Sequence, residues 1–230
     1  MSAGSQIPTV RAFPRLSPAG RDRLIAFAGV ARATAARHGP PPAPAEGFSD
    51  EMGHRRPVDA PFLAWRSGRP VGPRPTGGMP LDVALWRIAA GEAGDVRAIL
   101  AGAAPGPGGF GALLDQGSVR TIEVWTETEL SALHALCWIA LRTGDAALAA
   151  RTLDAARWHV AHMQPDNATN HPWGAHIFAL LDVLDDRREP GLYAQTLIHN
   201  CQVHLGRPDR LSTVILLDCA DAIDALVRGG

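Results

Sequence analysis

Residue types suited to chemistry are concentrated between Trp158 and Phe178. These 21 residues include four histidines, two tryptophans, one aspartate and three amide side chains. Histidine and aspartate transfer protons and bind metal ions, whereas amide and aromatic groups suit the hydroxyl groups and faces of sugars. Pro165 and Pro172 stand at the two ends of the polar centre, where a proline ends one helix or begins another. The stretch therefore predicts a helix–loop–helix junction with its polar loop over residues 164–171.

The elements that must position this loop are predicted to be helices. Short breakers rich in glycine, proline and aspartate separate segments of helical periodicity, and no segment has convincing strand character. A first helix should open at Ser17 and end at His38. The later helices are expected as two short ones within 81–100 and longer ones over 127–142, 146–163, 172–187, 192–205 and 210–228. The expected fold class is all-α.

The composition of the chain changes near residue 80. Between residues 39 and 80, 17 of 42 residues are proline or glycine, which predicts no compact element there. We therefore expect residues 1–79 to form an N-terminal arm, with one helix and an extended segment, and residues 80–230 to form a helical-hairpin domain. A free tail is the alternative. The side chains expected to pin the arm to the domain are Phe48, Phe62, Leu63, Trp65 and Met79.

Two kinds of helix are expected in the domain. Residues 130–141 and 173–184 are apolar on nearly every side, which predicts burial on every side. Residues 146–163 instead carry an apolar stripe opposite Arg151 and Asp154, which is typical of a helix that faces solvent. Inner and outer helices should therefore alternate along the chain.

The spacing of these helices indicates a repeat of hairpins. The dipeptides that begin at Gly94 and Gly144 are both Gly-Asp and lie 50 residues apart. Spacings of about 40–50 residues are typical of helical-hairpin repeats. Over about residues 80–228 the chain resembles the α/α toroid, the helical barrel shared by terpenoid cyclases, prenyltransferases and several glycan-degrading hydrolases. The resemblance implies a substrate site at one mouth of the barrel, although residues 182–186, DVLDD, do not match the Asp-rich motifs of the terpene enzymes.

The same alternation should bring polar residues from distant segments to one rim. In a row of hairpins, the N-terminus of an inner helix lies at the same end as the C-terminus of an outer helix. Helix N-termini there favour a carboxylate or an anionic ligand. The residues expected to supply acid–base chemistry are Glu127, Asp166 and His171. The side chains expected to bind a ligand are Trp125, His134, Trp158, His159, His162, Asn167, Asn170, Trp173 and His199.

Several of these residues also have an ordinary structural interpretation. Thr126 and Glu129 fit a capping box, in which the threonine caps the helix and the glutamate bonds back to its amide. His134, within an apolar helix, suits a hydrogen-bonded core position, and the DNATN stretch suits turn formation. His159 and His162 are spaced to share a metal ion, but two histidines make half a site, so no metal centre is predicted.

Composition narrows the class of partner. A net charge of −1 and a pI near 6.7 argue against nucleic acid. No apolar run approaches the ~18 residues of a transmembrane helix, so no membrane span is expected. Three cysteines within apolar helical patterns predict reduced, buried thiols and a cytoplasmic protein. Nucleotide and dinucleotide motifs are absent, and no particular cofactor is indicated.

Two functions stay open. The first is a binding or scaffold domain whose rim takes a small polar or carbohydrate-like ligand or a partner protein, without catalysis. The second is a toroid-type hydrolase or lyase that acts on a glycan-like substrate through carboxylate and histidine acid–base chemistry. The expected three to four hairpins are fewer than a closed barrel needs. That shortage favours the first function, or a homo-oligomer that completes the barrel of the second.

Overall fold

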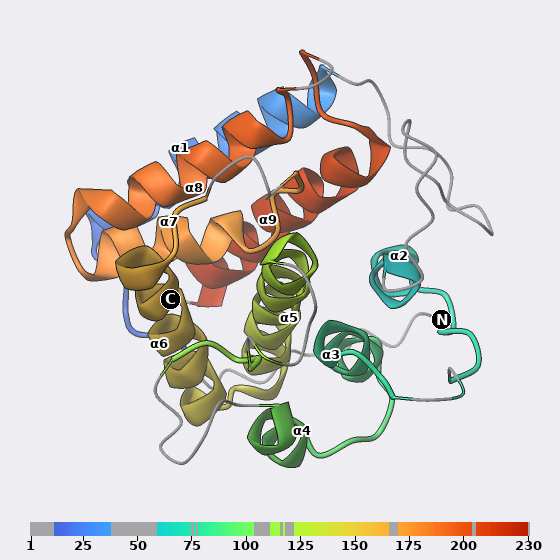
Figure 1. Cartoon of the computed structure of the whole chain (residues 1–230). Helices are drawn as coiled ribbons and strands as arrows, with labels where there is room; N and C mark the ends of the chain where they lie inside the picture. Colours follow the sequence, from blue (N-terminus) through green and yellow to red (C-terminus); the bar gives the residue numbers. More distant parts are fainter. Residues whose placement is uncertain are drawn as a thin grey trace, which may run out of the picture.

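The computed structural model describes residues 12–37, 59–74, 76, 78–103, 111–115, 117, 122–165, 170–203 and 206–229 (Figure 1). Every regular element in these residues is an α-helix, which confirms the all-α prediction. In chain order the helices are α1 (Pro18–Ala36), α2 (Asp59–Ser67), α3 (Leu81–Ala89), α4 (Val96–Ala103), α5 (Ile122–Thr143), α6 (Ala146–His162), α7 (Ala175–Leu184), α8 (Arg188–Asn200) and α9 (Arg210–Gly229). None of these helices is long and apolar enough to cross a membrane.

Four helices begin after side chains that bind their first backbone amides. Ser17 before α1, Asp95 before α4, Asp145 before α6 and Asp209 before α9 each accept hydrogen bonds from amides two or three residues later. The distances are between 2.6 and 3.1 Å. Short polar side chains are the preferred N-caps, so the local sequence explains these four boundaries.

Helices α5 and α7 lie at the centre of the molecule (Figure 1). Helix α5 packs between α3 and α6, helix α7 packs against α1, α6 and α8, and both contact α9. Helix α5 is buried at every residue from Trp125 to Cys137, and α7 is buried from Ala175 to Leu181. The two segments that are apolar on nearly every side thus occupy the interior, where no face meets water.

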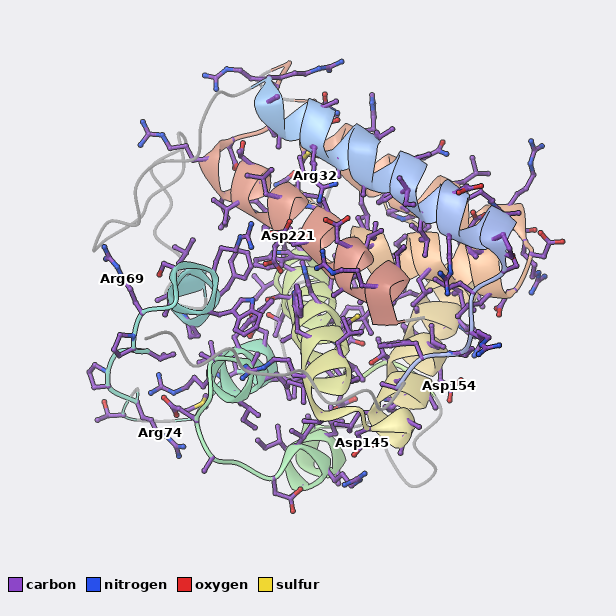
Figure 2. All side chains as sticks on the ribbon, turned by 180° about the vertical axis from the view of Figure 1, so that it is seen from behind. Arg32, Arg69, Arg74, Asp145, Asp154 and Asp221 are labelled. Carbon is purple, nitrogen blue, oxygen red and sulfur yellow. The ribbon has the colours of Figure 1, made fainter. Side chains whose placement is uncertain are left out.

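Among the described helices, the first packs against the last. Helix α1 lies along α9, and Leu24 and Ala28 of α1 belong to the common hydrophobic core. On the outer side of this contact, Arg32 faces Asp221 (Figure 2), and the two form an ion pair at 3.6 Å. Residues from both ends of the chain therefore contribute to one core.

Helix α2 corrects the expectation that no compact element forms between residues 39 and 80. Pro61 lies in the first turn of this helix, where its missing amide hydrogen costs no helical hydrogen bond. Phe62 is fully buried and Trp65 packs against the same core. Burial of these aromatic side chains outweighs a composition rich in helix breakers. Phe48, another expected anchor, lies outside the described residues.

The start of α5 corrects the predicted capping box. The helix begins at Ile122 instead of residue 127, so Thr126 lies in its second turn. There the hydroxyl of Thr126 donates to the carbonyl of Ile122 at 2.8 Å. The capping prediction was wrong because a cap acts on the unbonded amides at a helix start, and the preceding turn already supplies acceptors. Glu129 is thereby available to bind another segment.

Two other helices have boundaries that differ from the prediction. Helix α7 begins at Ala175 instead of residue 172, because Gly174 adopts a left-handed backbone with φ of 69°. Helix α8 spans Arg188–Asn200 instead of 192–205, because Pro190 occupies its first turn and does not break it.

The contact of α1 with α7 yields a prediction for two glycines of α1. A methyl group at Gly20 would overlap Cγ1 of Val183 on α7, whereas one at Gly29 would meet no atom within 4 Å. Gly20→Ala is expected to lower the free energy of unfolding by about 1–3 kcal/mol. Gly29→Ala is the matched control, and it should raise stability by about 0.5–1 kcal/mol by improving helix propensity.

Urea denaturation of the two glycine variants measures both effects. A Gly20→Ala protein at least as stable as the parent would contradict the close packing of α1 on α7.

Candidate functional site

Two predicted site residues, Glu127 and His171, form an ionic cluster with Asp209, which the sequence analysis did not single out. Nδ1 of His171 lies 3.1 Å from Oε2 of Glu127, and Nε2 of His171 lies 3.3 Å from Oδ2 of Asp209. The backbone amide of His171 also donates to Glu127 at 3.2 Å. The cluster joins the second turn of α5, the segment before α7 and the N-cap of α9. Two of the three residues expected to supply acid–base chemistry are therefore in contact.

Two carboxylates determine the charge of His171. Burial by itself lowers the pKa of this histidine, but the charge of Glu127 and hydrogen bonds with Asp209 and Glu127 outweigh that effect and raise the pKa to about 10. Burial raises the pKa of Asp209, but the interaction with His171 and the amide of Ser212 hold it below its usual value. At neutral pH the imidazole is a cation between two anions, an arrangement that stabilises the fold and can also serve acid–base chemistry.

The second group is centred on Glu129 and anchors residues 111–114. The two carboxylate oxygens of Glu129 accept hydrogen bonds from the amides of Leu113 and Leu114, at 2.6 and 2.8 Å. Arg151 of α6 donates to the carbonyls of residues 111 and 112, and it therefore binds the same segment from the other side. Glu129 is fully buried. These contacts assign Glu129 a structural role that the sequence did not indicate.

Histidine 159 and its neighbours extend this second group. Nε2 of His159 lies 3.4 Å from Glu129, and Nδ1 lies 3.5 Å from the hydroxyl of Tyr193. The ring of Trp125 stacks on His159 at a centroid distance of 5.9 Å. His159 is fully buried, so it points away from His162, which is exposed and stacks on Trp158 at 5.0 Å. The two histidines face different surroundings, so they are not placed to share a metal ion.

The other predicted residues lie in different places. His134 and Trp173 are fully buried among aromatic rings, and Asn170 is exposed. His199 is exposed in the last turn of α8. Asp166 and Asn167 lie outside the described residues.

A buried trio of metal-ligand types was missed by the sequence analysis. His134 of α5, His176 of α7 and Cys219 of α9 are all fully buried, and one ligand atom of each lies within 4.8 Å of the other two. Their separations of 42 and 43 residues match no local metal motif. The available signal was weaker: His134 and His176 are isolated polar residues within apolar segments, and Cys219 follows an apolar run of α9.

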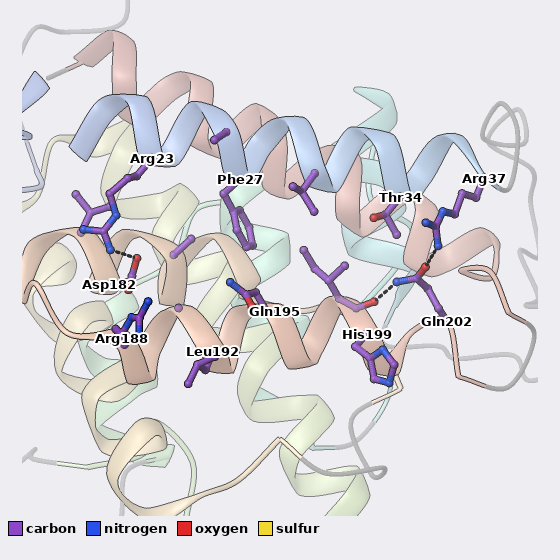
Figure 3. Close-up of a pocket in the computed structure, with 16 residues that line it drawn as sticks. Arg23, Phe27, Thr34, Arg37, Asp182, Arg188, Leu192, Gln195, His199 and Gln202 are labelled. Carbon is purple, nitrogen blue, oxygen red and sulfur yellow. Dashed lines mark hydrogen bonds and ion pairs between the residues drawn. The ribbon is translucent and has the colours of Figure 1, made fainter. Parts of the chain in front are cut away.

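A surface groove is the second feature that the sequence did not indicate. Helices α1 and α8 run side by side over α7 and leave between them a groove of about 890 Å³ (Figure 3). Hydrogen bonds from Arg23 to Asp182 at 2.5 Å and from Arg37 to Gln202 at 2.6 Å lie towards its two ends. The apolar residues that line the groove are Ala26, Phe27, Val30, Ala179, Val183, Leu192 and Ile198.

Comparison with protein-family models, with curated proteins and with solved structures found no match for this chain. The function proposed below therefore rests on the geometry of the described residues.

Proposed function

We propose that the protein is a non-catalytic binding domain whose groove between α1 and α8 takes an acidic amphipathic helix of a partner protein. The observation that carries this proposal is the combination of an apolar groove floor with arginines along its edges. Partner helices commonly bind by placing their apolar face in such a groove.

Exposed apolar side chains support a protein partner. Val30 of α1 is 53% exposed and Leu192 of α8 is 59% exposed, and both line the groove. Phe27 is partly buried beside them. A helix laid between α1 and α8 would remove these side chains from water, and burial of apolar surface is the main favourable term in protein association.

The charges along the groove favour an acidic partner. Three arginines and one aspartate line it, namely Arg23, Arg37, Arg188 and Asp182. Arg23 is bound to Asp182, whereas Arg188 makes no ion pair among the described residues. Complementary charge fixes the orientation of a partner and accelerates its association.

The length of the groove suits a short helix. Arg23 and Arg37 are 14 residues apart on α1, which corresponds to about 21 Å at 1.5 Å per residue. A partner helix of about four turns would span this distance and could present acidic residues to both ends.

The arrangement of the inner helices supports a related proposal about the fold. Helices α3 and α5 pack together, and α5 and α7 both contact α9, as expected of the inner row of an open α/α toroid. In the hydrolase alternative, Glu127 and His171 would be the acid–base pair, because they are in contact. Hydrolysis of a glycan that is lost in both Glu127→Gln and His171→Gln would favour that alternative over binding.

A designed peptide tests the binding proposal. The probe is a fluorescein-labelled 15-residue helical peptide with leucines on one face and glutamates on the other. A control peptide carries lysines in place of the glutamates. Fluorescence anisotropy should show binding of the acidic peptide and at least tenfold weaker binding of the basic one. Arg188→Glu and Leu192→Ser should each weaken binding of the acidic peptide about tenfold, which corresponds to about 1.4 kcal/mol.

The matched control for Leu192→Ser is Ile122→Ser, because Ile122 is 49% exposed on α5 and lies outside the groove. Equal loss of binding in the control, or equal binding of both peptides, would contradict the proposal. Self-association that Leu192→Ser abolishes would identify a second copy of the chain as the occupant and would also overturn it.

A further inference from the structure

His134 of α5, His176 of α7 and Cys219 of α9 lie close together in the core. The rings of His134 and His176 have centroids 4.3 Å apart, and Nδ1 of His176 lies 3.4 Å from Sγ of Cys219. Histidine nitrogen and cysteine sulfur are the ligands that zinc and copper prefer in proteins. The position of each ligand is determined by a well-packed helix, because α5, α7 and α9 are all buried at these residues.

His176 carries a buried nitrogen that needs a partner. Nε2 of His176 has no hydrogen-bond partner among the described residues, although its side chain is fully buried. Burial and the neighbouring His134 keep its pKa well below the usual value, so the ring is neutral and retains a lone pair. A buried polar atom without a partner costs about 1–3 kcal/mol, and a metal bond would remove that cost.

The surroundings of Cys219 keep its thiol protonated when no metal ion is bound. Burial and the charge of Asp218 hold the pKa of this thiol well above its usual value, and the backbone amides of His176 and Ala175, in the first turn of α7, oppose that shift only in part. The thiol of Cys219 also donates a hydrogen bond to the carbonyl oxygen of Pro172, with Sγ 3.6 Å from that oxygen. This bond holds the thiol proton when no metal ion is bound. A metal ion would replace that proton, as metal binding to cysteine generally does.

A second layer of residues orients His134. Nε2 of His134 lies 3.1 Å from Oδ2 of Asp218, and the same oxygen accepts a hydrogen bond from Trp138 at 2.7 Å. Arg66 lies 3.5 Å from the other carboxylate oxygen. Histidines that bind metals typically have their second ring nitrogen held by a carboxylate in this way. The other nitrogen of His134, Nδ1, accepts a long hydrogen bond of 3.4 Å from the backbone amide of Gly174, which a metal ion would replace. The rings of Phe62, Trp86 and Trp173 surround the same histidine.

We propose that His134, His176 and Cys219 bind one thiophilic transition-metal ion, Zn²⁺ or Cu⁺, in the core of the protein. The ion connects α5, α7 and α9, and it enters as the chain folds because all three ligands are buried. This site is independent of the groove and of its partner.

The test begins with unmodified protein refolded from denaturant with equimolar Zn²⁺, Cu⁺ or Mg²⁺, then freed of unbound metal by gel filtration. Elemental analysis should find about one zinc or copper ion per chain and no magnesium, since magnesium prefers oxygen ligands. When the protein is refolded with Zn²⁺ and Cu⁺ together, the metal that stays bound identifies the natural ion. Retention of neither metal would overturn the proposal.

Variants then locate the ion. Cys219→Ser should lower the bound metal at least tenfold, whereas Cys201→Ser, the control for another buried thiol, should leave it unchanged. Equal loss in both variants, or no loss in Cys219→Ser, would overturn the proposal.

If Cys219→Ser fails to fold, Co²⁺ is used instead to detect a thiolate ligand in the unmodified protein and in Cys201→Ser. Both should show a thiolate-to-cobalt charge-transfer band after refolding with Co²⁺. Absence of the band in both proteins would contradict a thiolate ligand.

Discussion

Glu129→Gln is expected to lower the free energy of unfolding by about 3–5 kcal/mol. The substitution keeps the shape of the side chain but replaces one carboxylate oxygen with an amino group. That group would face an amide donor of Leu113 or Leu114, each of which now bonds to a carboxyl oxygen in the interior. The loss is large because a hydrogen bond is removed and a buried donor is left without an acceptor.

Urea denaturation measures the global effect of Glu129→Gln, and hydrogen exchange at the amides of Leu113 and Leu114 measures the local one. Both amides should exchange much faster in the variant. Glu123→Gln is the matched control, since Glu123 is exposed in the first turn of the same helix, and it should change stability by less than about 0.5 kcal/mol. A Glu129→Gln protein within about 1 kcal/mol of the parent would contradict the anchoring role of Glu129.

The second large effect is a decrease of stability at alkaline pH that depends on His171. The pKa of this histidine is raised from 6.5 to about 10 in the folded protein. A raised pKa means that the folded state binds the proton more tightly than the unfolded state, so protonation stabilises the fold. That contribution is complete below about pH 6.5 and is lost as the pH rises towards 10.

Asp209 acts in the opposite pH range. Its pKa is lowered in the folded protein, chiefly by His171 against the effect of burial. Its contribution to stability is therefore present above the unfolded pKa and is lost as the pH falls through the folded one. Stability should accordingly be greatest between the two ranges, near pH 5–6.5.

Thermal unfolding across pH 5–10 measures the effect, with His171→Ala as the reference. The substitution removes the cation from between two carboxylates and should cost on the order of 3–5 kcal/mol at pH 6.5. The difference between the parent and His171→Ala should shrink steadily towards pH 10. A difference that is the same at every pH would contradict ionisation of His171 as its source.

A double-mutant cycle with Glu127→Gln and His171→Ala separates the pair from its surroundings. The two residues are in contact at 3.1 Å, so their effects at pH 6.5 should fail to add by about 0.5–3 kcal/mol. Additive effects would assign the stability of the cluster to Asp209 or to backbone contacts alone.

The helices themselves are determined by local sequence. Helical periodicity, the N-cap residues Ser17, Asp145 and Asp209, and the breakers between segments depend on neighbours within a few residues. The all-round apolar character of α5 and α7 also predicted that these two helices would be central. The errors fall at α2 and at the boundaries of α5, α7 and α8. At α2, burial against distant residues outweighs local propensity.

The polar contacts were predictable only in part. Helix order alone placed Glu127 and His171 at one end of the hairpins, because an inner helix begins where an outer one ends, and these residues do meet. Helix order could not indicate that Glu129 bonds to the amides of Leu113 and Leu114, since the conformation of that segment depends on tertiary contacts.

Only the tertiary structure decided which distant side chains share a site. His134, His176 and Cys219 are more than 40 residues apart, and they meet because α5, α7 and α9 pack with particular faces inward. The groove depends in the same way on α1 crossing from the start of the chain to lie beside α8. Periodicity predicts that a helix has an apolar face, but the helix that covers this face is chosen by shape complementarity between side chains far apart in sequence.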